Sequence, residues 1–405
     1  MYQLYQAQSD MLAPMRAMAR LSSAMLGGPF AYMFGSYFGR NVAAGCELLS
    51  RTALTHVRPP FGFDSVHIRG REVAVCEERA HVAPFATLLH FKKDLATAQP
   101  RVLLVAPMSG HFSTLLRETA RTLLAENDVY ITDWHNARDV PADAGRFDFD
   151  DYIAYLIRFL EILGPGAHVV AVCQPSPAAL AAVALMAQTN HPAQASSLTL
   201  MAGPVDARQN PTKVNELSTE HSMEWFEALI SRVPYGHRGA TRRVYPGFLQ
   251  LGGFLSMNFE RHVKAHQDLY DRIVARDDAK ADAVRAFYDE YFAVQDLPAE
   301  YFLQTIQKVF QNYALARGVL EWRGSRVEPA GIERTALLTV EGERDDICGI
   351  GQTLAAHDLC RSLRPSQKRH HFQAGVGHYG VFSGKRWHNE IYPVLQKHIF
   401  ASDAS

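Results

Sequence analysis

The sequence lacks the patterns that mark disulfide-rich, membrane-spanning and nucleic-acid-binding proteins. Its 405 residues include only five cysteines, an odd number without a CxxC pair, which predicts a reducing compartment rather than a disulfide framework or a zinc site. A formal net charge of −1 gives no electrostatic reason to expect a nucleic acid partner. No run is long and apolar enough to cross a bilayer, and the first residues show no signal-peptide pattern. We therefore expect a cytoplasmic protein.

What the sequence does contain is enough apolar material for a large core. Hydrophobic residues make up 47% of the chain and charged residues 20%, which is typical of a globular protein. The length fits one large domain with an insertion, or two domains.

Strand and helix patterns alternate through residues 59–204. Short β-rich runs come first and predict antiparallel entry strands at 65–69, 72–76 and 85–91. Apolar strands are then predicted at 101–106, 128–132, 168–173 and 197–201, with helices at 114–127, 149–163 and 177–188. Apolar strands that alternate with helices indicate a doubly wound, mostly parallel sheet with both faces covered.

The alternation stops after residue 204 and resumes at 334. Residues 205–333 contain aromatic-rich helical patterns and no clear strand, which predicts a helical cap inserted into the sheet domain. The remaining elements are predicted as strands at 335–340 and 369–372 and helices at 351–363 and 386–400. We therefore divide the chain into an N-terminal helical segment (1–58), a first part of the core (59–204), the cap (205–333) and a second part of the core (334–405).

The N-terminal segment is rich in methionine and aromatic residues. They include Met11, Met25, Phe30, Tyr32, Met33, Phe34, Tyr37 and Phe38. Leu12, Met15, Met18 and Ala19 fall at helical spacing, which favours a face packed on the body of the protein or on a second subunit of a homo-oligomer. The alternative is a soft apolar surface for a water-insoluble partner.

Cys173 lies where an apolar strand gives way at once to a helix. The segment reads Ala171-Val172-Cys173-Gln174-Pro175, in the place where α/β-hydrolases carry Gly-x-Ser-x-Gly at their nucleophile elbow. Small Ala171 allows strand and helix to approach closely, and Pro175 fits a first helical turn. A helix N-terminus behind the cysteine favours its thiolate form. A buried core cysteine is the alternative on this segment alone.

An acid and a histidine follow in the order that α/β-hydrolases use. Asp345 comes three residues after the turn residue Gly342, beyond the strand at 335–340, and we expect it to orient the histidine; its neighbour Asp346 remains open. His378 lies in a glycine-rich loop between the last strand and the last helix, which lets the imidazole project towards the strand ends. The three residues together predict a Cys-His-Asp triad.

Acyl transfer also requires donors for the oxyanion. The backbone N–H of Gln174, directly after the nucleophile, is the first candidate. The second should come from the loop after the strand at 101–106, where Pro107 has no N–H, leaving Met108 or Ser109.

We expect neither a metal nor a bound cofactor. Residues 375–380 match GxGxxG, but too little chain follows to build a dinucleotide-binding βαβ unit. His370 and His371 alternate faces of a strand and have no HExxH or cysteine partner.

Four segments together resemble the intracellular poly(3-hydroxybutyrate) depolymerases. They are 172–175 (VCQP), 105–112 (VAPMSGHF), 342–346 (GERDD) and 375–379 (GVGHY), and the resemblance extends over essentially the whole chain. It implies an α/β-hydrolase fold, with Cys173 as nucleophile, Asp345 as acid and His378 as base. It also implies a soluble cytoplasmic enzyme bound to polyester storage granules, with coenzyme A as an alternative acyl acceptor to water.

Two alternative functions remain, an acyltransferase and a non-catalytic binding protein. Residues 129–136 and 150–153 are similar to segments of polyhydroxyalkanoate synthases, which are acyltransferases with the same triad. Synthases carry glycines around the cysteine, where this chain has Ala171 and Pro175, and they are usually longer. A non-catalytic granule-binding protein would have no need of three reactive residues in these loops.

Overall fold

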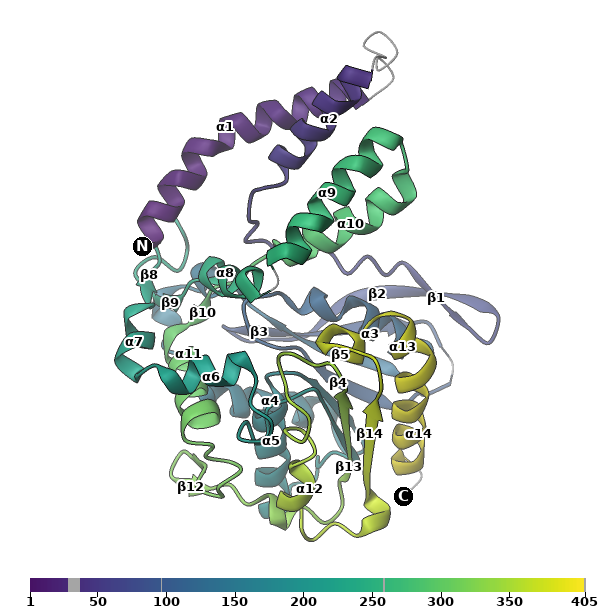
Figure 1. Ribbon diagram of the computed structural model, residues 1–405. Helices are drawn as coiled ribbons and strands as arrows, with labels where there is room; N and C mark the ends of the chain where they lie inside the picture. Colours follow the sequence, from purple (N-terminus) through teal and green to yellow (C-terminus); the bar gives the residue numbers. More distant parts are fainter. Residues whose placement is uncertain (28–36, 96, 258, 404–405) are drawn as a thin grey trace.

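A nine-stranded sheet runs through the centre of the computed structural model, which describes residues 1–27, 37–95, 97–257 and 259–403 (Figure 1). The strand order is β1-β2-β3-β5-β4-β6-β7-β13-β14. In that order the bounds are Ser65–Ile68, Arg71–Val82, Ala86–Lys93, Asp128–Trp134, Arg101–Val105, His168–Val172, Ser197–Met201, Ala336–Gly342 and Lys368–Gln373. Pairing is antiparallel from β1 to β5 and parallel from β5 to β14. This doubly wound, mostly parallel sheet is the α/β-hydrolase fold, as predicted.

Helices cover the parallel strands because those strands are apolar on both faces. Every residue of β6 and of β7 is buried, and so is β4 after its first residue. The helices of the core are α3 (Arg117–Leu123), α4 (Phe149–Leu163), α5 (Ser176–Gln188), α12 (Ala356–Leu359), α13 (Gly384–Arg386) and α14 (Tyr392–Asp403).

Helix α4 shows how the sequence sets the limits of one of these helices. The Asp148 carboxylate accepts hydrogen bonds from the N–H groups of Asp150 and Asp151, both at 3.0 Å, and so caps the first turn. Gly164 ends the helix with a φ of 77°, which a residue with a side chain adopts only with strain. The helix buries an apolar face made of Ile153, Leu156, Phe159, Leu160 and Leu163.

The helix predicted at 351–363 is wrong, because only α12 is helical in that region. The buried carboxylate of Glu341 accepts hydrogen bonds from the N–H groups of Gly351, Thr353 and Leu354, at 2.8 to 3.0 Å. These bonds hold the segment as a series of turns around a side chain that lies ten or more positions away in the sequence. A helical spacing of apolar residues depends only on neighbours in the sequence, so it cannot reveal that the Glu341 side chain holds this segment in turns.

The insertion between β7 and β13 contains short strands as well as helices, so the expectation of no strand there is wrong. Its helices are α6 (Lys213–Glu220), α7 (Met223–Ala228), α8 (Gly247–Met257), α9 (Phe259–Ala275), α10 (Asp278–Tyr291) and α11 (Ala299–Thr305), and a π-helical turn, Ile306–Gln311, continues α11. Its strands are β8 (Ser231–Arg232), β9 (Arg243–Tyr245), β10 (Leu297–Pro298), β11 (Glu321–Trp322) and β12 (Ser325–Arg326). Strands of two or three residues are too short to show a period-2 pattern.

Two N-terminal helices, α1 (Tyr2–Gly27) and α2 (Tyr37–Ser50), lie side by side next to α9 and α10 (Figure 1). Ion pairs and hydrogen bonds join α2 to α9 and α10. Glu47 pairs with Arg285 of α10 at 2.6 Å, and Tyr270 of α9 donates to the side chain of Asn41 at 2.7 Å. At the start of α1, the buried hydroxyl of Tyr2 donates to the buried carboxylate of Asp296 at 2.6 Å.

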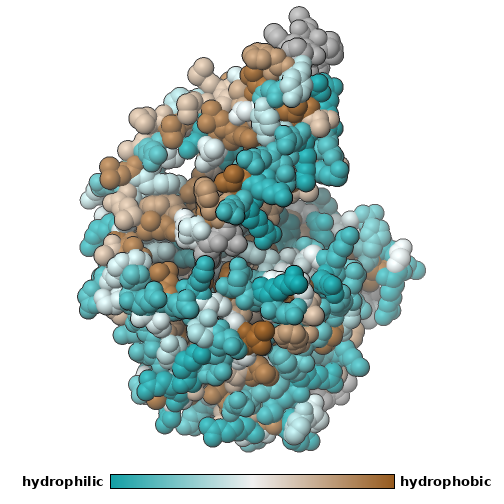
Figure 2. Space-filling view, viewed as in Figure 1, coloured by the Kyte–Doolittle hydropathy of each residue, from teal (hydrophilic) through white to brown (hydrophobic). Residues whose placement is uncertain are grey.

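The predicted stripe on α1 is divided between two faces. Ala19 is buried and Leu12 half-buried, whereas Met15 and Met18 are exposed and do not pack on the body of this chain. The outward face also carries Leu4, Met11, Leu21 and Met25, and apolar residues lie along α1 in Figure 2. Phe30, Tyr32, Met33 and Phe34 lie outside the described residues. Within the described part of the chain, every helix is too short or too polar to span a bilayer.

Candidate active site

Cys173 lies at the sharp turn between β6 and α5. Its φ is 68°, in the left-handed region that non-glycine residues rarely adopt. Its N–H donates to the carbonyl of Met201 at 2.7 Å, and its carbonyl accepts from the N–H of Ser176 at 3.1 Å. A Cβ on Gly203 would lie 1.9 Å from the Ser176 Oγ, so only glycine fits beside this turn. A strained turn that presents a nucleophile beyond the end of a strand is the geometry of a nucleophile elbow.

His378 and Asp345 meet beside this turn, although 33 positions separate them in the chain. The His378 Nδ1 lies 2.8 Å from one carboxylate oxygen of Asp345 and 3.0 Å from the other. Asp345 also accepts from the backbone N–H groups of Ile347 (2.9 Å) and Cys348 (2.8 Å). Both side chains are almost fully removed from solvent, at 1% exposure for Asp345 and 5% for His378. Two backbone N–H groups therefore hold the carboxylate in its contact with the imidazole.

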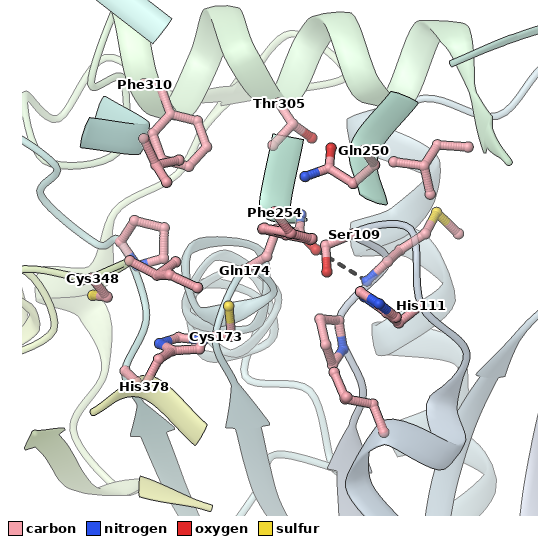
Figure 3. A pocket seen from close by; sticks show the side chains of 18 of the residues that line it. Ser109, His111, Cys173, Gln174, Gln250, Phe254, Thr305, Phe310, Cys348 and His378 are labelled. Atoms are coloured by element: carbon pink, nitrogen blue, oxygen red, sulfur yellow. Dashed lines mark hydrogen bonds between the residues drawn. The ribbon is translucent and has the colours of Figure 1, made fainter. Parts of the chain in front are cut away.

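The charge of the His378 imidazole depends on its burial and on the two side chains beside it. Burial lowers the pKa of His378, but the Asp345 carboxylate and the adjacent Cys173 side chain outweigh it and hold that pKa well above its usual value. Figure 3 shows the Cys173 thiol and the His378 ring beside one another at the base of the pocket. An imidazole that readily holds a proton next to a thiol favours transfer of the thiol proton to the ring.

The structure separates the two candidate acids that the sequence left open. The side chain of Asp345 is buried against His378, whereas Asp346 is exposed. Cys173, His378 and Asp345 are thus brought together, and Asp346 is not part of the cluster.

The three predicted oxyanion donors also lie around Cys173. Among the described residues, the backbone N–H of Gln174 has no hydrogen-bond partner. The N–H of Met108 donates to the side-chain oxygen of Gln174 at 3.2 Å (dashed line in Figure 3). Ser109 lines the same pocket. Of the two backbone donors, the N–H of Gln174 is therefore open, whereas the N–H of Met108 already has a partner.

A largely apolar cavity of about 150 Å³ extends from Cys173 into the insertion. Helix α8 contributes Gln250 and Phe254, which are labelled in Figure 3. Helix α11 with its π-helical turn contributes Tyr301, Phe302 and Phe310. The insertion therefore covers the thiol and supplies much of the cavity wall.

Sequence reasoning did not identify the individual residues of this wall. They are spread between positions 214 and 310 and belong to separate short helices whose packing no local pattern defines. The only signal was the aromatic richness of the insertion as a whole, which also fits an ordinary helical core. The sequence also contained no indication that the Gln174 side chain bonds to Met108 and Tyr301, which are distant in the chain.

Comparison with known proteins identifies a family along about half of the chain. Residues 202–403 match the family model described as "PHB de-polymerase C-terminus". The match includes the insertion, Asp345 and His378, whereas Cys173 precedes it. No curated protein matches the sequence.

Solved structures with a similar backbone have little sequence in common with this chain. The 2-hydroxy-6-oxo-6-phenylhexa-2,4-dienoate hydrolase of Rhodococcus sp. strain RHA1 is 14% identical, with a TM-score of 0.43 over 81% of this chain and 99% of that one. A thermophilic esterase of Thermogutta terrifontis is 14% identical, with a TM-score of 0.40 over 83% of this chain and 97% of that one. DcsB, in complex with its substrate analogue, is 12% identical, with a TM-score of 0.48 over 82% and 100%.

Proposed function

Because the chain belongs, through residues 202–403, to the poly(3-hydroxybutyrate) depolymerase family of carboxylic ester hydrolases, we propose that it cleaves this polyester with Cys173 as nucleophile. The observation that carries the proposal is the contact of the buried His378–Asp345 pair with the thiol at the base of an apolar cavity. A storage polyester offers a neutral, apolar chain with regularly spaced ester carbonyls, and such a chain matches a cavity with few polar groups.

The proposed reaction begins with proton transfer from Cys173 to His378, whose imidazolium Asp345 stabilises. The thiolate attacks the ester carbonyl carbon, and the oxyanion is held by the N–H groups of Gln174 and Met108. The intermediate collapses, the C–O bond breaks, and His378 returns its proton to the departing alcohol. The acyl group is now a thioester on Cys173. Water or the thiol of coenzyme A then attacks this thioester, with His378 as base, and the thiol of Cys173 is restored.

The experiment that tests this function is incubation of the purified protein with amorphous polyester granules, with and without coenzyme A. We expect soluble 3-hydroxybutyrate species, or their coenzyme A thioesters when coenzyme A is present. Crystalline polymer should be a poor substrate, because a covered site admits only a mobile chain. Polymer formation from 3-hydroxybutyryl-coenzyme A, with no product released from granules, would instead assign the protein as a synthase. Binding to granules without either reaction would assign a coat protein.

We also propose that the exposed face of α1 contacts the granule. It presents Leu4, Met11, Met15, Met18 and Met25 to solvent over much of the length of the helix. This face of α1 carries no charged side chain, so it can lie against a neutral polyester without removing a charge from water. The methionine side chains are flexible and can adapt to an irregular surface.

Two glutamates on this face should therefore weaken granule binding. In the double variant Met15→Glu/Met18→Glu, both charges would lose water on contact with the polymer, and we expect the cosedimenting fraction to fall at least about fivefold. The matched control is Ala13→Glu/Ala17→Glu, which adds the same charges at exposed positions on the other side of α1. Turnover of a soluble oligomer should be unchanged in both variants. Equal granule binding by the two double variants would refute this role, and dissociation of an oligomer by the first alone would assign the face to a second subunit.

A further inference from the structure

The side chain of Gln174 has a role that the triad does not explain. Its carboxamide oxygen accepts the hydrogen bond of the Met108 N–H, the donor expected to bind the substrate oxyanion. Its carboxamide nitrogen donates to the hydroxyl of Tyr301 on α11. Gln174 therefore connects the loop after β4 to the insertion, directly beside Cys173.

The other contacts of the β4 loop keep its backbone in place without Gln174. The carbonyl of Ala106 accepts from the Trp134 Nε1 at 2.8 Å and from the Tyr152 hydroxyl at 3.3 Å. The N–H of Ala106 donates to the Thr132 Oγ1 at 2.9 Å. Trp134 and Tyr152 stack on one another with ring centres 4.3 Å apart, and both are fully buried. Three side chains of the core thus hold the residue two positions before Met108.

Tyr301 is a fixed anchor for the far end of Gln174. It is 1% exposed and stacks on Tyr152 with ring centres 5.0 Å apart. Burial raises the pKa of Tyr301, so its hydroxyl remains protonated and neutral. When the carboxamide pivots about its hydrogen bond to the Tyr301 hydroxyl, the amide nitrogen keeps this contact and the amide oxygen moves away from Met108.

We propose that the Gln174 side chain is a positioning residue that occupies the Met108 N–H in the empty enzyme and gives it up to the ester carbonyl. The proposal rests on the proposed function, since it takes the carbonyl attacked by Cys173 as the group that displaces the amide. An unpaired N–H in an apolar cavity is unfavourable, and the carboxamide removes that cost when no substrate is present. Each ester carbonyl that enters must then compete with the enzyme's own amide.

Two variants of Gln174 test this competition. Methionine has a similar length but accepts hydrogen bonds only weakly, so Gln174→Met should leave the Met108 N–H open. With a soluble 3-hydroxybutyrate oligomer we expect KM to fall about fivefold with kcat within twofold, because ground state and transition state gain the same interaction. In the Cys173→Ala background, the same change should tighten oligomer binding, measured by calorimetry, about fivefold.

Glutamate should act in the opposite direction and add a pH dependence. The carboxylate of Gln174→Glu would hold the Met108 N–H more strongly and repel the oxyanion, so we expect kcat/KM to fall at least about 50-fold at pH 8. The ratio of this variant to the wild type should recover as the pH falls and the carboxylate is protonated. A pH-independent ratio would show that a charge on this side chain does not reach the oxyanion, which would contradict its placement at the Met108 N–H.

The outcomes separate this proposal from the function on which it rests. If Gln174→Met lowers kcat and leaves KM and oligomer affinity unchanged, Gln174 is a fixed support of the loop and the competition is refuted. If Cys173→Ala retains wild-type turnover, the proposed function itself fails, whatever Gln174 does. Circular dichroism and the thermal midpoint of each variant show whether it is folded.

Discussion

Replacing Cys173 with alanine is expected to abolish ester cleavage, by a factor on the order of 10⁴ or more in kcat, while the protein stays folded. Alanine fits the turn because the pocket side of Cys173 is open and the residue is only half-buried. The elbow contributes Cys173 and Gln174 to the cavity, and of these two side chains the thiol is the nucleophile, so alanine leaves none at the elbow. Turnover of a soluble oligomer, measured by the release of 3-hydroxybutyrate, checks the loss.

His378→Ala should be nearly as damaging, because groups that act as one unit lose function together. Cys76→Ala is the matched control: it removes an exposed thiol on β2, at the opposite end of the sheet order from β14, and should leave kcat unchanged. A folded Cys173→Ala protein with more than about a tenth of wild-type activity would rule out Cys173 as the nucleophile.

The second large effect is expected at Asp345. In Asp345→Asn the amide can still accept from the N–H groups of Ile347 and Cys348, so the loop should keep its shape. Its NH₂ group would face the His378 Nδ1 and force the proton onto the other ring nitrogen, which then cannot accept the proton of Cys173. We expect kcat to fall about 10²- to 10⁴-fold. Asp346→Asn, at an exposed position without contact to His378, should change kcat less than about threefold.

The same variant has a pH signature whose sign follows from the charges. The Asp345 carboxylate raises the pKa of His378, so its removal should lower that pKa and disfavour the imidazolium–thiolate pair. Alkylation of Cys173 by iodoacetamide near pH 6.5 should therefore be slower in Asp345→Asn than in the wild type, and unchanged in Asp346→Asn. Equal alkylation rates in all three proteins would show that Asp345 does not hold the imidazolium.

The order of strands and helices in the core could be predicted from the sequence, because each element is recognisable from the residues within it. Apolar strands alternate with helices, and the apolar face of α4 repeats with helical spacing, so each element is visible in its own residues. The abrupt change from strand to helix at Cys173 and the loops that hold Asp345 and His378 follow from the same alternation. Each of these loops comes directly after a strand, and parallel strands bring such loops to one edge of a sheet.

The parts that could not be predicted depend on distant partners. The turns at 351–355 form around the side chain of Glu341, and the hydrogen bonds of Gln174 require Met108 and Tyr301 to be brought together by the fold. The sequence favoured Asp345 by its distance from Gly342 but left Asp346 open, because the burial that distinguishes these two adjacent aspartates is not visible in a sequence.

The N-terminal helices show another limit of periodicity. A helical repeat of Leu12, Met15, Met18 and Ala19 predicts one apolar face, but α1 has two, and the pattern does not say which of them packs. The inward face meets the rest of the chain, whereas the outward face includes Met15 and Met18 and remains in contact with solvent in a single chain.

The central claim is that a thioester on Cys173 is the intermediate of polyester cleavage. Mass spectrometry of the acid-quenched enzyme, after brief mixing with a linear 3-hydroxybutyrate oligomer, tests it most directly. We expect a hydroxyacyl adduct on the peptide that contains Cys173. This adduct should be absent from Cys173→Ala, and added coenzyme A should remove it as the corresponding coenzyme A thioester appears. A hydroxyacyl adduct on Ser109, Ser176 or any other residue during turnover would contradict it.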